Sequence, residues 1–301
     1  MSTARKGPRM PRGKCLRLAE LAARVETRED VHALAAAVRS TTRRAGGDWW
    51  RFGKRIAVWL ESDGELEPPH TLFVEGNGKL PFFAWSTLPI VTCPGRGTCE
   101  RWCYSLKGWR YPAAFFRMLQ NTVLERTAWG RERIRAAWDA LPSGADVRLY
   151  VDGDHATLDG LAWWCERMRE RSDLPVYGYS KSWHLLTAYG ARNAFPASYV
   201  LNVSSGSRFD HDAAMRARVE ALAITRGGFV AVDGLTTHAD YREGHEAEQR
   251  AHLAELRERA RAVLGTSKVF ACPGRCGTCT PQGHACGSMR LAGVPIVIAA
   301  H

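Results

Sequence analysis

From residue 82 onward, short apolar runs alternate with longer segments of helical periodicity, and this alternation constrains the fold more than any other feature. The apolar runs have the length and the β-branched and aromatic content of buried strands. They are residues 82–86, 147–151, 175–179, 199–203, 229–232, 268–271 and 294–299, and the helical segments are 112–140, 157–171, 183–192, 211–225 and 245–264. Such alternation predicts a parallel sheet covered by helices. We therefore expect an α/β protein built as a complete or partial (β/α) barrel.

The residues before position 82 follow a different pattern. Residues 1–14 combine prolines and glycines with basic side chains, and we expect a disordered basic tail there. Residues 15–81 are expected to form an N-terminal extension of two helices and a strand pair, the strands at 55–60 and 71–74. Thr27 and Asp30 have the spacing of a capping box at the start of the second helix. The remaining residues, 82–301, form the expected barrel-like domain, with metal-binding loops at 93–103 and 272–286.

Charge and cysteine content indicate which kind of partner and which cell compartment to expect. The chain has 42 Lys and Arg against 31 Asp and Glu, a net charge of +11, which favours an anionic partner such as DNA or RNA. No stretch of about 18 apolar residues is present, and no apolar segment follows the basic N-terminus, so we expect no membrane partner and a cytoplasmic protein. In a reducing compartment, the nine cysteines are better interpreted as metal or redox ligands than as disulfides.

Seven of the nine cysteines lie in two short loops that both begin with Cys-Pro-Gly-Arg. The second loop holds Cys272, Cys276, Cys279 and Cys286, which suffice to bind a tetrahedral zinc ion or an iron–sulfur cluster. This metal could take part in a reaction, or it could only stabilise the fold. The first loop holds Cys93, Cys99 and Cys103. Three ligands leave one coordination position open, as a catalytic metal requires. Two alternatives stay open: His155 as a fourth ligand of a structural zinc ion, or one site shared by both loops.

Polar residues follow successive predicted strands, where a barrel places its active site. Candidate catalytic residues are Asp152, Asp154 and Lys181, and polar side chains that could bind a cofactor are Ser180, Asn202 and Ser204. The alternative is that each aspartate only caps the helix that follows it.

Several segments resemble the gene product 88 family of phages and plasmids. They are the cysteine run at 93–105, the nearby Tyr111, Pro112, Arg117 and Asn121, the segments 147–154 and 176–181, and the C-terminal cysteine cluster. The resemblance covers residues 82–290 and implies a phage-related protein, without naming an activity.

A more distant resemblance is to radical S-adenosylmethionine (SAM) enzymes, which carry three cysteines after the first barrel strand. It implies that Cys93, Cys99 and Cys103 hold a 4Fe–4S cluster to which SAM binds, with Tyr104 as the aromatic residue beside the last cysteine. In that family a Gly-Gly-Glu motif ends the second strand. Here Asp152-Gly153-Asp154 stands in its place, so Gly153 and Asp154 would contact SAM, Asp154 at its amino group. The cysteine spacing is C-x5-C-x3-C, wider than the family's C-x3-C-x2-C.

Basic and aromatic residues surround the first cysteine loop: Arg96, Arg101, Lys107, Trp109, Arg110, Tyr111 and Arg117. Such interleaving suits a single-stranded or flipped base. The alternative is that Trp109 and Tyr111 belong to the core and that the arginines are only solvated.

Three functions are consistent with these patterns. The first is an iron–sulfur, radical-SAM-like enzyme that modifies a nucleic acid or nucleotide, with a second metal site at the four-cysteine loop. The second is a transglycosylase that exchanges a base for a 7-deazaguanine, using Asp152, Asp154 or Asp233 and a structural zinc ion. The third is a nucleic-acid-binding protein stapled by zinc, without enzymatic activity.

Overall fold

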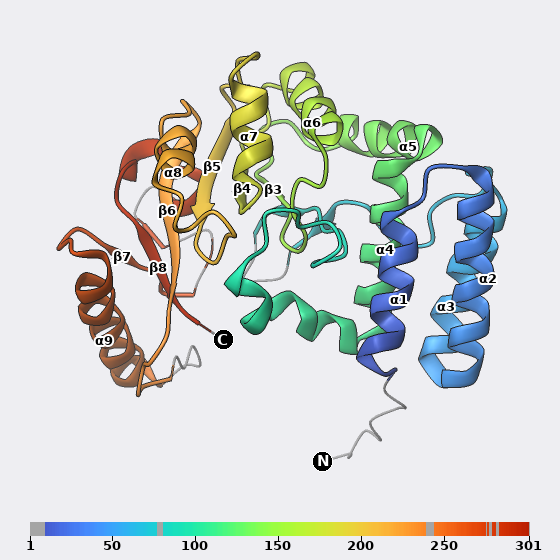
Figure 1. Ribbon diagram of the computed structural model, residues 1–301, viewed down its shortest axis with the longest axis horizontal. Coiled ribbons are helices and arrows are strands. Elements are labelled where there is room, and N and C mark those ends of the chain that lie inside the picture. The colour runs from blue at the N-terminus through green and yellow to red at the C-terminus, as the bar shows by residue number, and fades with distance from the viewer. Residues whose placement is uncertain are drawn as a thin grey trace. The chain divides into compact units, whose positions relative to one another are not determined.

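The computed structural model describes residues 10–76, 81–238, 244–274, 276, 279–280 and 283–300. The chain forms two compact units, each of which draws on several segments (Figure 1). The helical unit comprises Met1–Val74, Trp85–Thr92 and Tyr104–Leu141. The sheet unit comprises Glu75–Ala84, Cys93–Cys103 and Pro142–His301.

The helical unit contains five α-helices and a 3₁₀ helix in its described residues. They are α1 (Arg12–Ala23), α2 (Arg28–Ala45), α3 (Gly47–Glu61), η2 (Tyr104–Arg110), α4 (Pro112–Arg126) and α5 (Ala128–Asp139). The capping box before α2 is confirmed, because Thr27 Oγ1 accepts from the Asp30 N–H at 3.2 Å and Asp30 Oδ2 accepts from the Thr27 N–H at 2.9 Å. The single helix expected at 112–140 is two helices, since Thr127 is extended and caps α5.

Two predictions for the N-terminal part are wrong. Residues 55–60, expected as a strand, lie in α3, where Trp49, Ile56 and Leu60 are buried along one helical face. The only strand in the described part of 15–81 is β1 (Val74–Glu75). The disordered tail predicted at residues 1–14 extends too far, because Met10 is buried and α1 begins at Arg12, directly after Pro11. Residues 1–9 of that tail lie outside the described residues.

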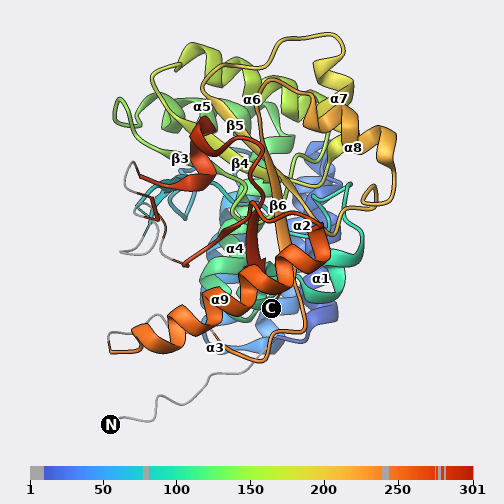
Figure 2. The same cartoon turned by 90° about the vertical axis from the view of Figure 1, so that its left-hand side faces the viewer.

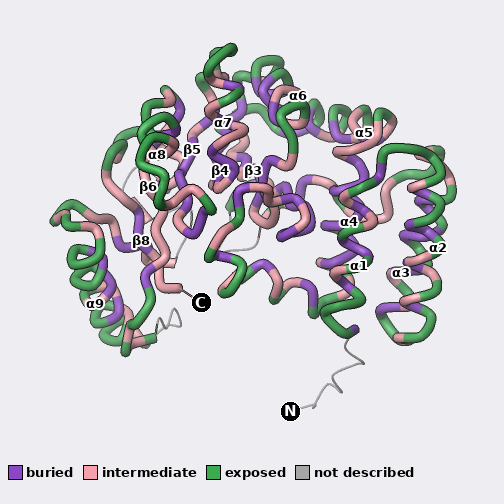
Figure 3. Tube along the Cα trace, viewed as in Figure 1, coloured by how far each residue is buried: buried purple, intermediate pink, exposed green. Residues whose placement is uncertain are grey.

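The sheet has eight strands in the order β1-β2-β3-β4-β5-β6-β8-β7. Every neighbouring pair from β2 to β7 is parallel. All seven strands predicted from residue 82 onward are confirmed: β2 (Phe83–Ala84), β3 (Val147–Leu149), β4 (Val176–Ser180), β5 (Tyr199–Ser204), β6 (Thr225–Val232), β7 (Phe270–Ala271) and β8 (Ile296–Ala299). Most of β3, β4 and β5 is buried (Figure 3).

The sheet is open in the described residues, so of the complete or partial barrel expected from the sequence the complete form is wrong, and the partial form stays a prediction. β1 and β7 are its two edges, and no pairing among the described residues joins them. The strands from β1 to β6 follow chain order, as in a barrel, but β8 lies between β6 and β7. This reversal ends the regular winding that closure needs.

The α-helices of the sheet unit cover one side of the sheet. They are α6 (Leu158–Glu170), α7 (Trp183–Gly190), α8 (Ala213–Glu220) and α9 (Glu246–Leu264), which ends at Gly265 with φ +64°. Right-handed connections between strands in chain order place α6, α7 and α8 on the same side. The apolar side of α9 packs on Val230 and Val232 of β6 and on Val297 of β8. The course of α9 across the lower part of the sheet unit can be followed in Figure 2.

The opposite side of the sheet, which we call the inner face, is defined by Arg148, Tyr177, Tyr179, Asn202 and Phe229. In-register pairs join Arg148 to Tyr177 and Tyr179 to Asn202, and the rings of Tyr179 and Phe229 lie 4.5 Å apart. Phe229 alternates with Val230, which packs on α9, so the inner face is the one that α9 does not cover. The short helix η3 (Ala285–Gly287) of the second cysteine loop contacts β4 and β5.

No helix in the described part of the chain is both long enough and apolar enough to cross a membrane.

Candidate functional site

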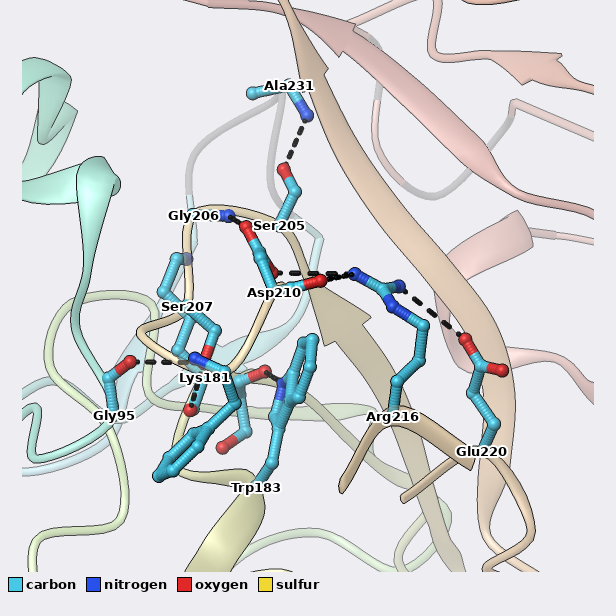
Figure 4. Close-up of polar contacts among 12 residues, drawn as sticks. Gly95, Lys181, Trp183, Ser205, Gly206, Ser207, Asp210, Arg216, Glu220 and Ala231 are labelled. Carbon is cyan, nitrogen blue, oxygen red and sulfur yellow. Dashed lines mark hydrogen bonds and ion pairs between the residues drawn. The ribbon is translucent and has the colours of Figure 1, made fainter. Parts of the chain in front are cut away.

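The first cysteine loop, residues 93–103, is docked at the carboxyl ends of β4 and β5. Ser207 Oγ lies 3.1 Å from the carbonyl oxygen of Gly95 and 2.9 Å from that of Lys181 (Figure 4). The Arg208 N–H donates to the Gly95 carbonyl at 3.0 Å. The loop is therefore tied to the turns that follow both strands, which is where α/β proteins place their reactive groups.

Glycines allow this close approach. A Cβ atom on Gly95 would lie 1.8 Å from the Lys181 carbonyl oxygen, a distance that no side chain tolerates. Gly206 has φ +81°, and a Cβ atom there would lie 2.7 Å from Cys99 Cβ. The Gly206 carbonyl accepts from the N–H groups of Gly97 at 3.0 Å and Cys99 at 3.2 Å. Backbone contacts thus hold the loop against the sheet.

The three thiols of this loop differ in exposure: Cys99 is buried, whereas Cys93 and Cys103 are half-buried. Among the residues that the structure describes, no three His, Cys, Asp or Glu side chains converge closely enough to hold a metal ion. The iron–sulfur site at Cys93, Cys99 and Cys103 stays a prediction.

Asp154 lies buried between the turns after β3 and β4. Its Oδ1 accepts from the His155 N–H and from Ser180 Oγ, both at 2.8 Å. Its Oδ2 accepts from the N–H groups of Lys181 at 2.8 Å and Ser182 at 3.1 Å. A carboxylate has about four acceptor positions, so these bonds engage all of them. In this arrangement Asp154 is a positioning residue that joins two strand-end turns.

The other predicted site residues fall in several places. Ser180 and the Lys181 backbone converge on Asp154, while Asp152 is half-buried and Gly153 takes φ +85° in the turn after β3. Ser204 is buried at the end of β5, and Asp233 is exposed after β6. Tyr104 belongs to the helical unit.

His155, the alternative fourth ligand, is buried beside Tyr150 and Tyr199. Its Nε2 lies 3.2 Å from the Tyr199 hydroxyl, and its ring meets the Tyr150 ring edge-on at 4.8 Å. Tyr150 has φ +57°, a left-handed backbone that tyrosine rarely adopts. Burial lowers the pKa of His155 to about 4, so the ring is neutral at pH 7.

The second cysteine loop lies on the inner face. Asn202 Nδ2 donates to the Cys286 carbonyl at 2.9 Å, and the Ala285 N–H donates to Cys279 Sγ at 3.2 Å. Burial raises the pKa of Cys272, and charge on Cys276 and Cys279 raises it further. Burial likewise raises the pKa of Cys286 to about 12, with added repulsion from Cys272 and Cys279. These four thiols are covered by the same finding, that no three metal-ligating side chains converge among the described residues, so the metal centre of the second cysteine loop also stays a prediction.

Two arginines beside this loop were not singled out by the sequence. Arg148 of β3 stacks on the Tyr179 ring at 4.6 Å, and its charge lowers the pKa of Cys286 against the dominant effect of burial. Arg226 of β6 is fully buried and donates to the Ala285 carbonyl at 3.0 Å. Arg148 stands inside the strand predicted at 147–151, where a guanidinium is unusual, and this signal could have found it. Arg226 lies before the strand predicted at 229–232, so no such signal marked it in the sequence.

The 3₁₀ helix η2 of the helical unit presents a stripe of aromatic and basic side chains. Tyr104, Lys107 and Arg110 are exposed, and Tyr111 follows with 66% of its surface accessible. Residues three apart align in a 3₁₀ helix, so the first three share one face. Trp109 is buried against Phe115, as the alternative interpretation expected, whereas Tyr111 is not part of the core. We call Tyr104, Lys107, Arg110 and Tyr111 the η2 stripe.

Cations also gather on the sheet unit around the first cysteine loop. Arg101 lies in η1 (Thr98–Trp102), Lys181 follows β4, and Arg208 follows the turn that holds the loop. None of these three forms an ion pair with a described residue, whereas Arg96 pairs with Glu100 at 3.3 Å.

A family model described as gene product 88 matches residues 63–293. No curated protein and no solved structure matches the chain.

Proposed function

Since the chain belongs to the gene product 88 family, which names no chemistry, we propose its function from its sites: a metal-dependent enzyme that modifies a nucleic acid or nucleotide. In this proposal Cys93, Cys99 and Cys103 hold a 4Fe–4S cluster of the radical-SAM type. Cys272, Cys276, Cys279 and Cys286 hold a second cluster or a zinc ion. The observation that carries the proposal is the docking of the three-cysteine loop at the carboxyl ends of β4 and β5.

The loop is built as a supported site rather than as a loose connection. Gly95, Gly97 and Gly206 allow backbone contacts that side chains would prevent, and Ser207 joins the loop to the turn after β4. Reactive groups need such support to hold their geometry. The winding of β1 to β6 in chain order is also the arrangement that a partial barrel would have.

A cluster of this class, when it holds SAM, supplies one-electron chemistry to the substrate. The residues of this chain would provide its setting. Three thiolates would bind the cluster and leave one position open, and Asp154 would keep the turns after β3 and β4 in place through its four hydrogen bonds. A direct contact from Asp154 to SAM would require one of these bonds to break.

The substrate class follows from charge and aromatic exposure. Between Arg101 and Leu124 the sequence has four basic residues and no acidic one. The η2 stripe lies in this segment and pairs cations with two exposed tyrosines. Cations that bind phosphates and rings that stack on bases are the two elements of single-strand recognition.

The deciding experiment is anaerobic purification with counts of iron, zinc and sulfide and a visible spectrum. We expect iron and sulfide in wild-type protein, with part of the absorbance lost in a Cys93→Ser/Cys99→Ser variant. A matched Cys15→Ser/Cys165→Ser variant should keep the full spectrum, because Cys15 and Cys165 lie outside both loops. A colourless wild-type protein with zinc and no sulfide would refute the iron–sulfur proposal.

That refuting outcome would leave the two zinc alternatives. They are the nucleic-acid-binding protein stapled by zinc and the transglycosylase. A base-exchange assay with labelled guanine would separate the staple from the transglycosylase, which requires Asp152, Asp154 or Asp233 to react.

A further inference from the structure

The helical unit carries a second group of aromatic and basic side chains besides the η2 stripe. The rings of Phe52 and His70 stack with their centroids 5.8 Å apart and 20° between their planes. Arg51 Cζ lies 4.8 Å from the centroid of the Phe52 ring, so three planar groups are in contact. Arg51 also pairs with Asp48 at 3.0 Å, but both side chains are about two-thirds exposed, and such surface pairs are weak. Phe52 and His70 are half-buried, so the stack reaches the surface.

The backbone of His70 fixes the position of this stack. The His70 N–H donates to Gln120 Oε1 and the His70 carbonyl accepts from Gln120 Nε2, both at 2.9 Å. Gln120 lies on α4 and is fully buried. The imidazole Nε2 of His70 has no hydrogen-bond partner among the described residues. The backbone therefore anchors His70 to α4, while Nε2 is left for a contact from outside the chain.

Two further arginines face the His70 ring, Arg55 from α3 and Arg117 from α4. Burial, together with the charges of these two arginines, lowers the pKa of His70 to about 4, so its ring is neutral at pH 7. Arg55 Nη2 donates to the Pro69 carbonyl at 3.1 Å, and Arg55 forms no ion pair with a described residue. From residue 49 to residue 60 the sequence has three basic residues and no acidic one. Positive charge therefore dominates around the stacked rings.

The first turns of α4 connect this group with the η2 stripe. Tyr111 of the stripe directly precedes α4, and Arg117 lies in the second turn of that helix. Ala113 and Ala114 share a side of α4 with Arg117, because residues three and four apart on a helix are neighbours. Ala113 is exposed, so this side carries only small uncharged side chains between Tyr111 and Arg117. Six residues of helix span about 9 Å, a distance short enough for one strand to contact both groups.

We propose that Arg51, Phe52, Arg55, His70 and Arg117, which we call the Phe52 patch, form a second contact for the single-stranded nucleic acid that binds the η2 stripe. The arginines contact phosphates, and the stacked planar groups accept a base, since rings and guanidinium planes both stack on bases. The unpaired Nε2 of the neutral His70 ring supplies a hydrogen bond to that base or its sugar. This inference rests on the proposed nucleic-acid partner, but not on a metal at either cysteine loop.

The test measures the affinity of the full chain for single-stranded oligodeoxythymidine of about 5 and about 16 nucleotides at several salt concentrations. Wild type should bind the longer strand about tenfold more tightly or more, because two linked contacts reinforce each other. Arg55→Gln/Arg117→Gln should lose most of this gain and reduce the slope of log affinity against log salt by about one to two. Arg55→Lys/Arg117→Lys keeps both charges and should retain the wild-type slope.

A ring variant and a charge control complete the set. Phe52→Leu removes the stacked ring but keeps an apolar side chain, and it should weaken binding of the longer strand about fivefold or more with little change in slope. The control is Arg250→Gln/Arg257→Gln, which removes two exposed arginines of α9 in the sheet unit and should keep the gain with length. Melting temperatures identify any variant that fails to fold.

A measurement on wild type does not depend on the folding of any variant. A longer strand that carries a photoreactive base is cross-linked to the protein by light, and the attached peptides are identified by mass spectrometry. We expect attachment within residues 51–70 as well as within residues 104–111.

The outcomes separate this inference from the proposed function. Attachment confined to the η2 stripe, or a gain with length that the Phe52 patch variants keep or the α9 control also loses, would overturn the second contact alone. In that case binding would still weaken in Lys107→Ala/Arg110→Ala, and the nucleic-acid partner would stand. A wild type that binds neither strand would refute the nucleic-acid partner itself.

Discussion

At the scale of single residues, Asp154 shows how hydrogen bonds within the fold can engage every acceptor position of a carboxylate at a strand end. Its four donors are Ser180 Oγ at the end of β4, the N–H groups of Lys181 and Ser182 in the turn that follows, and the N–H of His155. An Asp154→Ala variant leaves these buried donors unpaired, and we expect a loss of about 3 kcal/mol or more in the free energy of unfolding. Asp233, exposed after β6, is the matched control, and Asp233→Ala should change stability by less than about 0.5 kcal/mol.

Chemical denaturation of both variants measures this difference. A residue that only contacts substrate or SAM would give the reverse result, full stability with lost activity, and that outcome would contradict the positioning role.

His155 makes the free energy of unfolding of the protein depend on pH. Burial lowers its pKa from 6.5 to about 4, so the folded protein binds this proton less tightly than the unfolded chain does. Stability is therefore fully present above pH 6.5 and falls as the pH drops toward 4, by up to about 3 kcal/mol. In His155→Asn the dependence between these pH values should become shallower. His70, whose pKa burial also lowers to about 4, should account for part of the dependence that remains. Unfolding free energies at several pH values test this, and an unchanged slope would contradict it.

At the scale of elements, the docking of the first cysteine loop depends on Gly206. Alanine there would need a left-handed backbone, which costs about 1–2 kcal/mol, and its Cβ atom would meet Cys99. We expect Gly206→Ala to displace the loop and to speed alkylation of Cys99, which is buried in the wild type. Gly144 also has a positive φ but has open space around it, so Gly144→Ala should leave the reactivity of Cys99 unchanged. Mass spectrometry of alkylated peptides distinguishes the two variants, and equal reactivity would refute the docking role.

The helices and strands also show where sequence patterns were sufficient to predict the structure. All seven strands from residue 82 onward were predicted, because buried parallel strands are short apolar runs between helices. The run at 55–60 was mistaken for a strand because six residues cannot separate a strand from a buried helix. The wider spacing of Trp49, Ile56 and Leu60 is helical.

The candidate site was predictable only in part. Cysteine spacing identified both loops, and strand ends identified Asp154 and Lys181. The sequence could not predict that hydrogen bonds engage all acceptor positions of the Asp154 carboxylate. Three of the donors, Ser180 Oγ and the N–H groups of Lys181 and Ser182, come from another strand end. Arg226 was missed because its significance depends on burial and on the absence of a described carboxylate partner.

At the scale of the whole molecule, the excess of basic residues should appear in nucleic-acid binding. A Lys107→Ala/Arg110→Ala variant should weaken single-stranded DNA binding and reduce the slope of log affinity against log salt by about one to two. Tyr111→Ala should lower the affinity by about 1–3 kcal/mol with little change in that slope, because it removes stacking rather than charge. Arg43→Ala/Arg44→Ala, at the end of α2, makes the same change in net charge away from the η2 stripe. Equal weakening in both double variants would show that only net charge acts.

The position of β8 governs the order in which the molecule can assemble. β7 has β8 as its neighbour in the described sheet, so it cannot join the sheet until the later strand has been synthesised. The four cysteines of the second loop lie between these two strands in the sequence. Asn202 and Arg226, which hydrogen-bond to the carbonyls of Cys286 and Ala285, lie on β5 and β6, which are synthesised earlier. During translation, the support for this loop is therefore complete before the loop itself. In chain order, the second cysteine loop and β8 are therefore the last parts to join the sheet unit.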